Sequence, residues 1–447
     1  MSKETKNSSH MCDCGEDVLY TIASKLPPKE SARTSILSSV WRCLWLWPNS
    51  MCPRLTFDAV EICKCGRDDM HKHMSRFISE VYRVLWLQHG DKVVETLKVR
   101  FDFVDDDNQL LLDQHIDNWV SIAVSLGTKN LNLDLKPRKW WNHNAPYAFP
   151  FHLLDWQSMS YLQHMQLSYV SLGRPPPHFK GFPNLRKLHL RTPHMSSKDL
   201  QHVLSRCCNL EWLHLDRCDL HGEQLMMSSP LPRLLYLKAS YCKLTRLEFN
   251  AVNLVTFKYT GYFAHIRLVH SSKLQGVNIK FFDVAVFRDA LASPLNGIPS
   301  VQSLTLWLDN LLRKKQWFWD NPLKFSNLKH LQLLLLISPK EADKILYSSA
   351  SVLRVTPFIK MLEVHYNAMK IWLSEEGLRR EDLVPYKYNY LKNIWITGFE
   401  GERAARISFA RRRKCARAQV PQSRHRPIPT SSKRFVIWRQ TTLRDES

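Results

Sequence analysis

The sequence predicts an α/β fold made of three short helices near the amino terminus, a long solenoid of stacked strand-and-turn repeats, and a disordered basic tail. Apolar residues recur in a short alternating pattern about every 27 residues from Val94 to Thr397, which is typical of a solenoid. The 447 residues carry 63 Lys and Arg against 41 Asp and Glu, a net charge of +22, and favour acidic partners. Only 13 residues are Gly, which argues against enzymes built on several glycine-rich phosphate loops.

The repeat is clearest in LEWLHLDRCDL, from Leu210 to Leu220, and in LLYLKASYCKL, from Leu234 to Leu244. Alternate residues of a strand point to opposite sides, so the two apolar residues of each L-x-L core need stacked neighbours to bury them. Cys218 and Cys242 follow their strands, and we expect them to turn inward as structural residues. We expect one strand around each of these positions: Leu97, Leu131, Met165, Leu188, Leu213, Leu237, Phe257, Val277, Leu304, Leu331, Leu362 and Ile394.

These cores resemble leucine-rich repeats over about 94–397, and the resemblance implies an irregular horseshoe solenoid. In the amino-terminal segment, Pro27 ends a first helix with one apolar face, and a second helix spans Lys29 to Leu37. Ser38 or Ser39 is a suitable N-cap for a third helix. Three short helices cannot enclose a large core, so exposed apolar surface predicts a protein partner.

The run from Asp17-Val18-Leu19 through Ser24-Lys25-Leu26-Pro27 to Trp41-Arg42 closely resembles an F-box, of the plant class in which leucine-rich repeats follow. The segment LKNIWITGFEG, from Leu391 to Gly401, is similar to the start of the FBD region of such proteins. The resemblance implies a non-catalytic, substrate-recognition subunit of an SCF-type cullin-RING E3 ubiquitin ligase. Its F-box would bind a Skp-type adaptor, and its repeats would bind an unknown target protein.

The sequence departs from the F-box pattern at two places. Cys14-Gly15 stands where F-boxes usually have a leucine-proline pair, and Val40 stands where they usually have a basic residue. Loss of the pair removes an apolar anchor and a helix-starting proline, so we expect weaker adaptor binding. The expected adaptor-binding residues are Val18, Leu19, Ile22, Leu26, Pro27, Leu37, Trp41, Leu44 and Trp45.

The outward strand positions predict a ladder of basic and aromatic side chains that suits an acidic or phosphorylated peptide. A merely solvated face is the alternative. Charge reversal at Lys187, Arg191 and Lys238 should abolish target capture if the ladder binds. The expected target-binding residues are Lys187, His189, Arg191, Trp212, His214, Tyr236, Lys238, Lys258 and Trp307, with Asp216 and Lys280 in the same ladder.

The expected domains are a disordered amino terminus (1–15), the F-box (16–50), a linker or helical cap (51–90), the repeats with an FBD-like end (91–401) and a disordered basic tail (402–447). The longest apolar stretch is far shorter than the roughly 20 residues of a membrane span, so we expect no membrane partner. Eleven scattered Cys favour a reduced protein in the nucleus, the cytoplasm or both. The runs Arg411-Arg412-Arg413-Lys414 and Lys433-Arg434 are candidates for nuclear localisation.

Other chemistries have weaker support. None of the hydrolase, P-loop, dinucleotide-binding or zinc-protease motifs is present, so we expect neither catalytic residues nor a cofactor. The nearest metal-like group is Cys63, Cys65, His71 and His73 with Cys12 and Cys14, but single-residue gaps strain a zinc chelate, and a loop is the preferred interpretation. Two alternatives remain open: a repeat scaffold with a degenerate F-box outside any ligase, and a nuclear nucleic-acid-associated protein, which is the less favoured.

Overall fold

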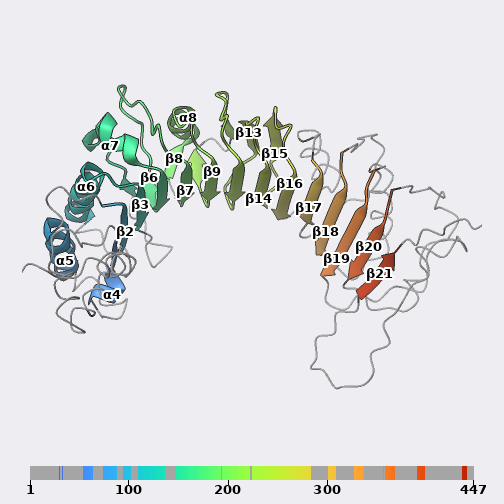
Figure 1. The fold of residues 1–447 in the computed structure, drawn as a ribbon, viewed down its shortest axis with the longest axis horizontal. Coiled ribbons are helices and arrows are strands. Elements are labelled where there is room, and N and C mark those ends of the chain that lie inside the picture. The colour runs from blue at the N-terminus through green and yellow to red at the C-terminus, as the bar shows by residue number, and fades with distance from the viewer. Residues whose placement is uncertain are drawn as a thin grey trace, which may run out of the picture. The chain divides into compact units, whose positions relative to one another are not determined.

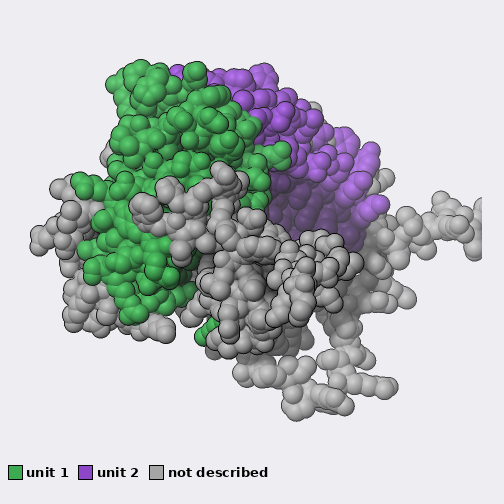
Figure 2. All heavy atoms as spheres, turned by 60° about the vertical axis from the view of Figure 1, so that its left-hand side comes forward, with its two compact units in different colours: residues 1–193 green, residues 194–447 purple. Residues whose placement is uncertain are grey.

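The computed structural model forms two compact units, residues 1–193 and 194–447, which Figure 2 draws in green and purple. We treat each unit by itself. Most of the sequence expected to form the F-box lies outside the described residues, although Glu30 and Arg33 are helical and paired through atoms 2.9 Å apart. The structure describes residues 30, 33, 54–63, 74–87, 94–101, 109–135, 146–192, 194–221, 224–282, 298, 301–308, 327–336, 356, 358–367, 390–397 and 435–439.

The main sheet of unit 1 has the order β1-β2-β3-β5-β7 with every neighbouring pair parallel. Parallel neighbours require a crossover between strands, and here the crossovers follow the chain direction one after another, as a solenoid requires. The five strands are β1 (Arg54–Asp58), β2 (Thr96–Arg100), β3 (Asn130–Asp134), β5 (His164–Ser168) and β7 (Lys187–Arg191).

Amphipathic helices cover the buried face of this sheet in its early repeats (Figure 1). Helix α5 (Met74–Leu87) buries Phe77, Val81 and Leu85, which are four residues apart and share one side. Helix α6 (Gln109–Ser125) packs on α5, and its Trp119 meets Phe77 edge to face at 5.8 Å. The smaller elements are α4 (Ala59–Cys63), β4 (Tyr147–Ala148), η3 (Phe151–Leu153), α7 (Trp156–Tyr161) and β6 (Val170–Ser171).

Unit 2 continues the same construction with longer strands. Its main sheet runs β9-β12-β14-β16-β17-β18-β19-β20-β21, and all neighbouring strands are parallel except β20 and β21, which are antiparallel. The strands are β9 (Trp212–Asp216), β12 (Tyr236–Ser240), β14 (Thr256–Tyr262), β16 (Gly276–Phe282), β17 (Ser303–Leu308), β18 (His330–Leu336), β19 (Met361–Asn367), β20 (Asn393–Thr397) and β21 (Phe435–Arg439).

The strand positions expected from the sequence are confirmed. Leu97, Leu131, Met165 and Leu188 are successive register partners in unit 1, and Leu213 begins an equivalent row in unit 2. That row passes through Leu237, Phe257, Val277, Leu304, Leu331, Leu362 and Ile394, all of which are buried. The apolar anchors therefore align because each one must cover the core of its neighbour.

The return segments of unit 2 depend on the length of the repeat. From Leu237 to Phe257 and from Phe257 to Val277 the step is 20 residues, and this leaves little room for a helix. Here the chain returns through β13 (Arg246–Asn250) and β15 (His265–Val269). With β11 (Gln224–Met226) of the preceding repeat they form a second parallel sheet. Ahead of β9 the chain instead forms β8 (His194–Ser196) and α8 (Ser197–Ser205), and β10 (Asp219–His221), which follows β9, pairs with β8 in parallel.

A left-handed residue follows several strands and turns the chain inward. Tyr169, Thr192, Arg217 and Tyr241 have φ between 49° and 59°, directly after β5, β7, β9 and β12. The Arg217 N–H donates to the Ser240 carbonyl at 2.8 Å, so the turn also bonds to the next repeat. Val170, Cys218 and Cys242, which follow three of these turns, are buried in the core, and this explains the buried Cys after the strand.

The structure differs from the sequence expectations at two ends of the repeats. The expected linker or helical cap at 51–90 contains β1, which already pairs with β2, so the sheet begins one strand earlier than expected. In the expected disordered tail, residues 435–439 form β21, which pairs antiparallel with β20 and covers its edge. Within the part of the chain that the structure describes, no helix is both long and apolar enough to cross a bilayer.

Candidate functional site: the outer face of the repeat sheets

The outer face is formed by the strand residues that alternate with the buried rows. On β9 these are Trp212, His214 and Asp216, while Leu213 and Leu215 between them are buried. Because neighbouring strands are in register, each outer residue has a partner at the same level on the next strand. Rows of polar and aromatic side chains therefore cross each sheet at right angles to its strands.

In unit 1 the outer face balances its charges over the first three strands. The Arg100 guanidinium lies 3.5 Å from a carboxylate oxygen of Asp58 and 3.8 Å from one of Asp134, its register partners on β1 and β3. The expected target-binding residues Lys187, His189 and Arg191 occupy all three outer positions of β7. The structure thus brings these three together on one strand of unit 1.

In unit 2 the expected aromatic residues are stacked. The rings of Trp212 and Tyr236 lie 5.2 Å apart and within 8° of parallel, at the same level of β9 and β12. His214 contacts Trp212 edge to face at 5.5 Å, and the Lys258 ammonium lies 5.6 Å from the centre of the Tyr236 ring. The stacked rings and the adjacent ammonium group form an ordered aromatic surface that remains partly exposed to solvent.

Three lysines occupy three successive strands of this face, and we call Lys238, Lys258 and Lys280 the lysine stripe. Lys238 and Lys258 are direct register partners on β12 and β14. Lys280, on β16, sits one level further along, where its ammonium lies 3.3 Å from the centre of the Trp307 ring and 5.3 Å from that of Phe282. Trp307 thus belongs to the Lys280 end of the stripe.

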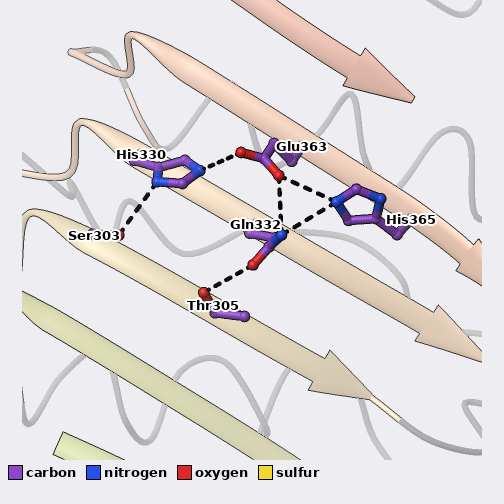
Figure 3. Close-up of polar contacts among 6 residues, drawn as sticks. All are labelled: Ser303, Thr305, His330, Gln332, Glu363 and His365. Atoms are coloured by element: carbon purple, nitrogen blue, oxygen red, sulfur yellow. Dashed lines mark hydrogen bonds and ion pairs between the residues drawn. The ribbon is translucent and has the colours of Figure 1, made fainter. Parts of the chain in front are cut away.

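A polar cluster that the sequence reasoning missed spans β17, β18 and β19 (Figure 3). Glu363 is at its centre: one carboxylate oxygen lies 2.9 Å from His330 Nε2, and the other accepts from Gln332 Nε2 at 2.9 Å and lies 3.2 Å from His365 Nε2. Thr305 Oγ1 donates to Gln332 Oε1 at 3.2 Å. The sequence pattern could have predicted this cluster, because its residues on β18 and β19 alternate with the apolar anchors Leu331, Leu333, Leu362 and Val364. The expected ladder of outward residues ended at Trp307 and therefore left the cluster out.

The cysteines of the repeats have structural roles. The Cys242 thiol lies 3.4 Å from the Ser240 carbonyl oxygen, and Cys218 is fully buried, which raises the pKa of its thiol. Among the described residues, no group of three or more His, Cys, Asp and Glu is arranged to hold a metal ion. Of the zinc candidates, Cys63 is buried in α4, and Cys12, Cys14, Cys65, His71 and His73 lie outside the described residues.

Comparison with known proteins agrees with this parallel, register-stacked class of solenoid. The family model described as "At1g61320/AtMIF1, LRR domain" matches residues 87–405. The chain is 25% identical over 405 residues to the F-box/FBD/LRR-repeat protein At1g13570 of Arabidopsis thaliana, covering 88% of this chain and 85% of the relative. It is 26% identical over 341 residues to the putative F-box/FBD/LRR-repeat protein At5g62970 of the same plant, covering 71% and 70%.

A third similar protein is the putative F-box/LRR-repeat protein At4g15060 of Arabidopsis thaliana, 25% identical over 364 residues, with 79% of this chain and 78% of the relative covered. The family model covers well over half of the chain, and its limits enclose every strand from β2 to β20. The chain belongs to the plant F-box/FBD/LRR-repeat protein family.

Proposed function

We propose that this protein is the target-binding subunit of an SCF-type cullin-RING ubiquitin ligase. Its F-box-like segment binds a Skp-type adaptor, its repeats bind the target protein, and other subunits transfer ubiquitin. The observation that carries the proposal is the similarity to F-box/FBD/LRR-repeat proteins over most of both chains. The outer face adds support, because a rigid sheet with cations and aromatic side chains between its strands suits protein recognition.

The adaptor-binding surface in this proposal consists of Val18, Leu19, Ile22, Leu26, Pro27, Leu37, Trp41, Leu44 and Trp45. Leu and Trp side chains supply most of the apolar area that such a contact buries. No covalent intermediate with ubiquitin is required of this chain, so it acts as a non-catalytic subunit in the nucleus, the cytoplasm or both.

Co-purification with a Skp-type adaptor tests the proposal. The full chain should retain the adaptor, and the Cys14→Leu/Gly15→Pro double variant should retain more, because it restores the apolar anchor and the helix-starting proline. Leu19→Glu should lose the adaptor, since it places a charge in an apolar contact. Lys258→Glu is the matched control on the outer face and should bind the adaptor as the unaltered chain does.

Failure of both the unaltered chain and the double variant to retain any adaptor would contradict the proposal. The chain would then be a repeat scaffold with a degenerate F-box outside a ligase.

A further inference from the structure

Several charged groups of the repeats have a carboxylate or cationic partner, whereas the three amines of the lysine stripe have none among the described residues. Elsewhere in unit 2, Glu248 lies 3.1 Å from Arg246 and 3.4 Å from Arg267. Glu363 is similarly enclosed by donors of its own cluster. Among the described residues, neither Lys238 nor Lys258 nor Lys280 forms an ion pair. The stripe therefore places three cations without an ion pair on the neighbouring strands β12, β14 and β16 of one face.

The arrangement of the stripe has a cost in the unbound protein. Lys238 and Lys258 are register partners on strands about 4.8 Å apart, and like charges directly opposite each other on a sheet repel. Tyr236 and Trp307 hold two of the cations, at 5.6 and 3.3 Å from their ring centres, so the ammonium groups of Lys258 and Lys280 are positioned in advance. An anion placed over the stripe would relieve the repulsion without moving the strands.

We infer that the lysine stripe is the docking site for a phosphorylated segment of the target protein. A phosphoserine or phosphothreonine carries a charge of about −1.5 to −2 near neutral pH, which matches two adjacent ammonium groups better than the single charge of a carboxylate. The stacked rings of Trp212 and Tyr236 lie directly beside the lysines and offer apolar area to the residues that flank the phosphate. This inference rests on the proposed function, since it names the target chemistry of the same face.

Fluorescence anisotropy with the purified full chain tests the inference. The probe is a labelled pool of short peptides with a central phosphoserine, and its comparison is the same pool with unmodified serine. We expect the phosphorylated pool to bind at least about tenfold more tightly. The Lys238→Gln/Lys258→Gln variant should lose that preference, whereas Lys238→Arg/Lys258→Arg should keep it because the charges remain.

The matched control is Lys243→Gln/Lys273→Gln, which removes two positive charges from unit 2, as many as the test variant removes, but outside the stripe. Lys243 pairs with Asp219 at 3.8 Å, and Lys273 donates to Asn253 Oδ1 at 2.7 Å, so neither belongs to the stripe. This control should change the affinity for the phosphorylated pool by less than about twofold, allowing for the loss of long-range attraction. Equal losses in the two double variants would overturn the inference, because net charge alone would then explain binding.

Equal binding of the phosphoserine and serine peptide pools would also overturn the inference. Tighter binding of an unphosphorylated glutamate pool or of a single-stranded oligonucleotide would do so too. The adaptor measurement is separate from this one. A chain that ignores the adaptor but binds phosphoserine through Lys238 and Lys258 refutes the ligase role and keeps the docking site. A chain that binds the adaptor but shows no preference for phosphoserine supports the ligase role and refutes the docking site.

Discussion

At the scale of single residues, the turns after β5, β7, β9 and β12 carry backbone strain, because each places a non-glycine residue at positive φ. Thr192 has φ of 49° directly after β7, and a β-branched residue is disfavoured there because its side chain crowds the backbone. Its hydroxyl donates to the Arg191 carbonyl at 2.8 Å, a local bond that compensates only in part. The repeat places this residue where the chain must leave the strand and enter the core.

Replacing Thr192 by Gly should therefore stabilise unit 1 by about 1 kcal/mol, because Gly adopts positive φ without a steric cost. Urea unfolding followed by circular dichroism measures the change. Thr192→Ala is the control: it also loses the hydroxyl but keeps the Cβ, so no gain is expected. A gain as large in the Ala variant would place the strain in the side chain and contradict the prediction.

Asp113 on α6 is a second residue whose surroundings have a measurable consequence. Burial, with a smaller contribution from the Asp117 charge, raises the pKa of Asp113 from its ordinary value to about 6. Asp113 Oδ1 also has no hydrogen-bond partner among the described residues. Asp117 by contrast accepts a hydrogen bond from the Tyr147 hydroxyl at 2.5 Å, and the pKa of that buried hydroxyl is raised.

The folded state therefore holds the Asp113 proton more tightly than the unfolded state does. The resulting stabilisation is present below about pH 4 and is lost as the pH rises through about 6. Asp113→Asn should raise the stability at pH 7 by about 1 kcal/mol, a value reduced for partial solvent screening, and should flatten stability between these pH values. Thermal unfolding at a series of pH values measures this, and an unchanged slope in the variant would refute it.

At the scale of elements, one strand shows how the two faces divide stability and recognition. On β14, Phe257 and Tyr259 are buried, and the Tyr259 hydroxyl donates to the Tyr262 carbonyl at 2.8 Å. Lys258 between them lies on the outer face against Tyr236. Adjacent residues of the strand thus contribute either to stability or to recognition, because successive side chains of a pleated strand point to opposite faces.

Phe257→Ala should cost about 3–5 kcal/mol of unfolding free energy, since it leaves a cavity in the row between Leu237 and Val277. Lys258→Ala, one position away, should change stability by no more than about 0.5 kcal/mol. Chemical denaturation of the two variants in parallel checks the pair. Similar losses in both would contradict the division of the strand into a core side and a binding side.

At the scale of the whole molecule, the repeat anchors were predictable and the ends of the array were not. The L-x-x-L-x-L spacing located β2, β3, β5, β7 and the main-sheet strands of unit 2 from β9 to β20, because stacked repeats must present apolar pairs to a common core. β1 escaped notice because RLTFD alone is too short to distinguish from a linker. β21 escaped because its chain is surrounded by basic residues that favour a tail.

The candidate site was predictable as a set of outward positions, but its pairings were not. The sequence named Trp212, Tyr236, Lys238 and Lys258 as outward residues. Which ring stacks on which, and which cation has no carboxylate partner, depend on the register between strands separated by about 20 or more residues. The Glu363 cluster is another product of that register, since His330, Gln332 and Glu363 lie on β18 and β19.

The sequence alone determined the class of fold and the alternation of its two faces, because burial of Leu, Val, Ile and Phe allows one side of each strand to be the core. Only the tertiary structure decided where the sheet begins, how each return segment is built, and which outer charges are neutralised. Those features arise from contacts between distant parts of the chain, and a local pattern of residues contains no information about the neighbour that each side chain meets.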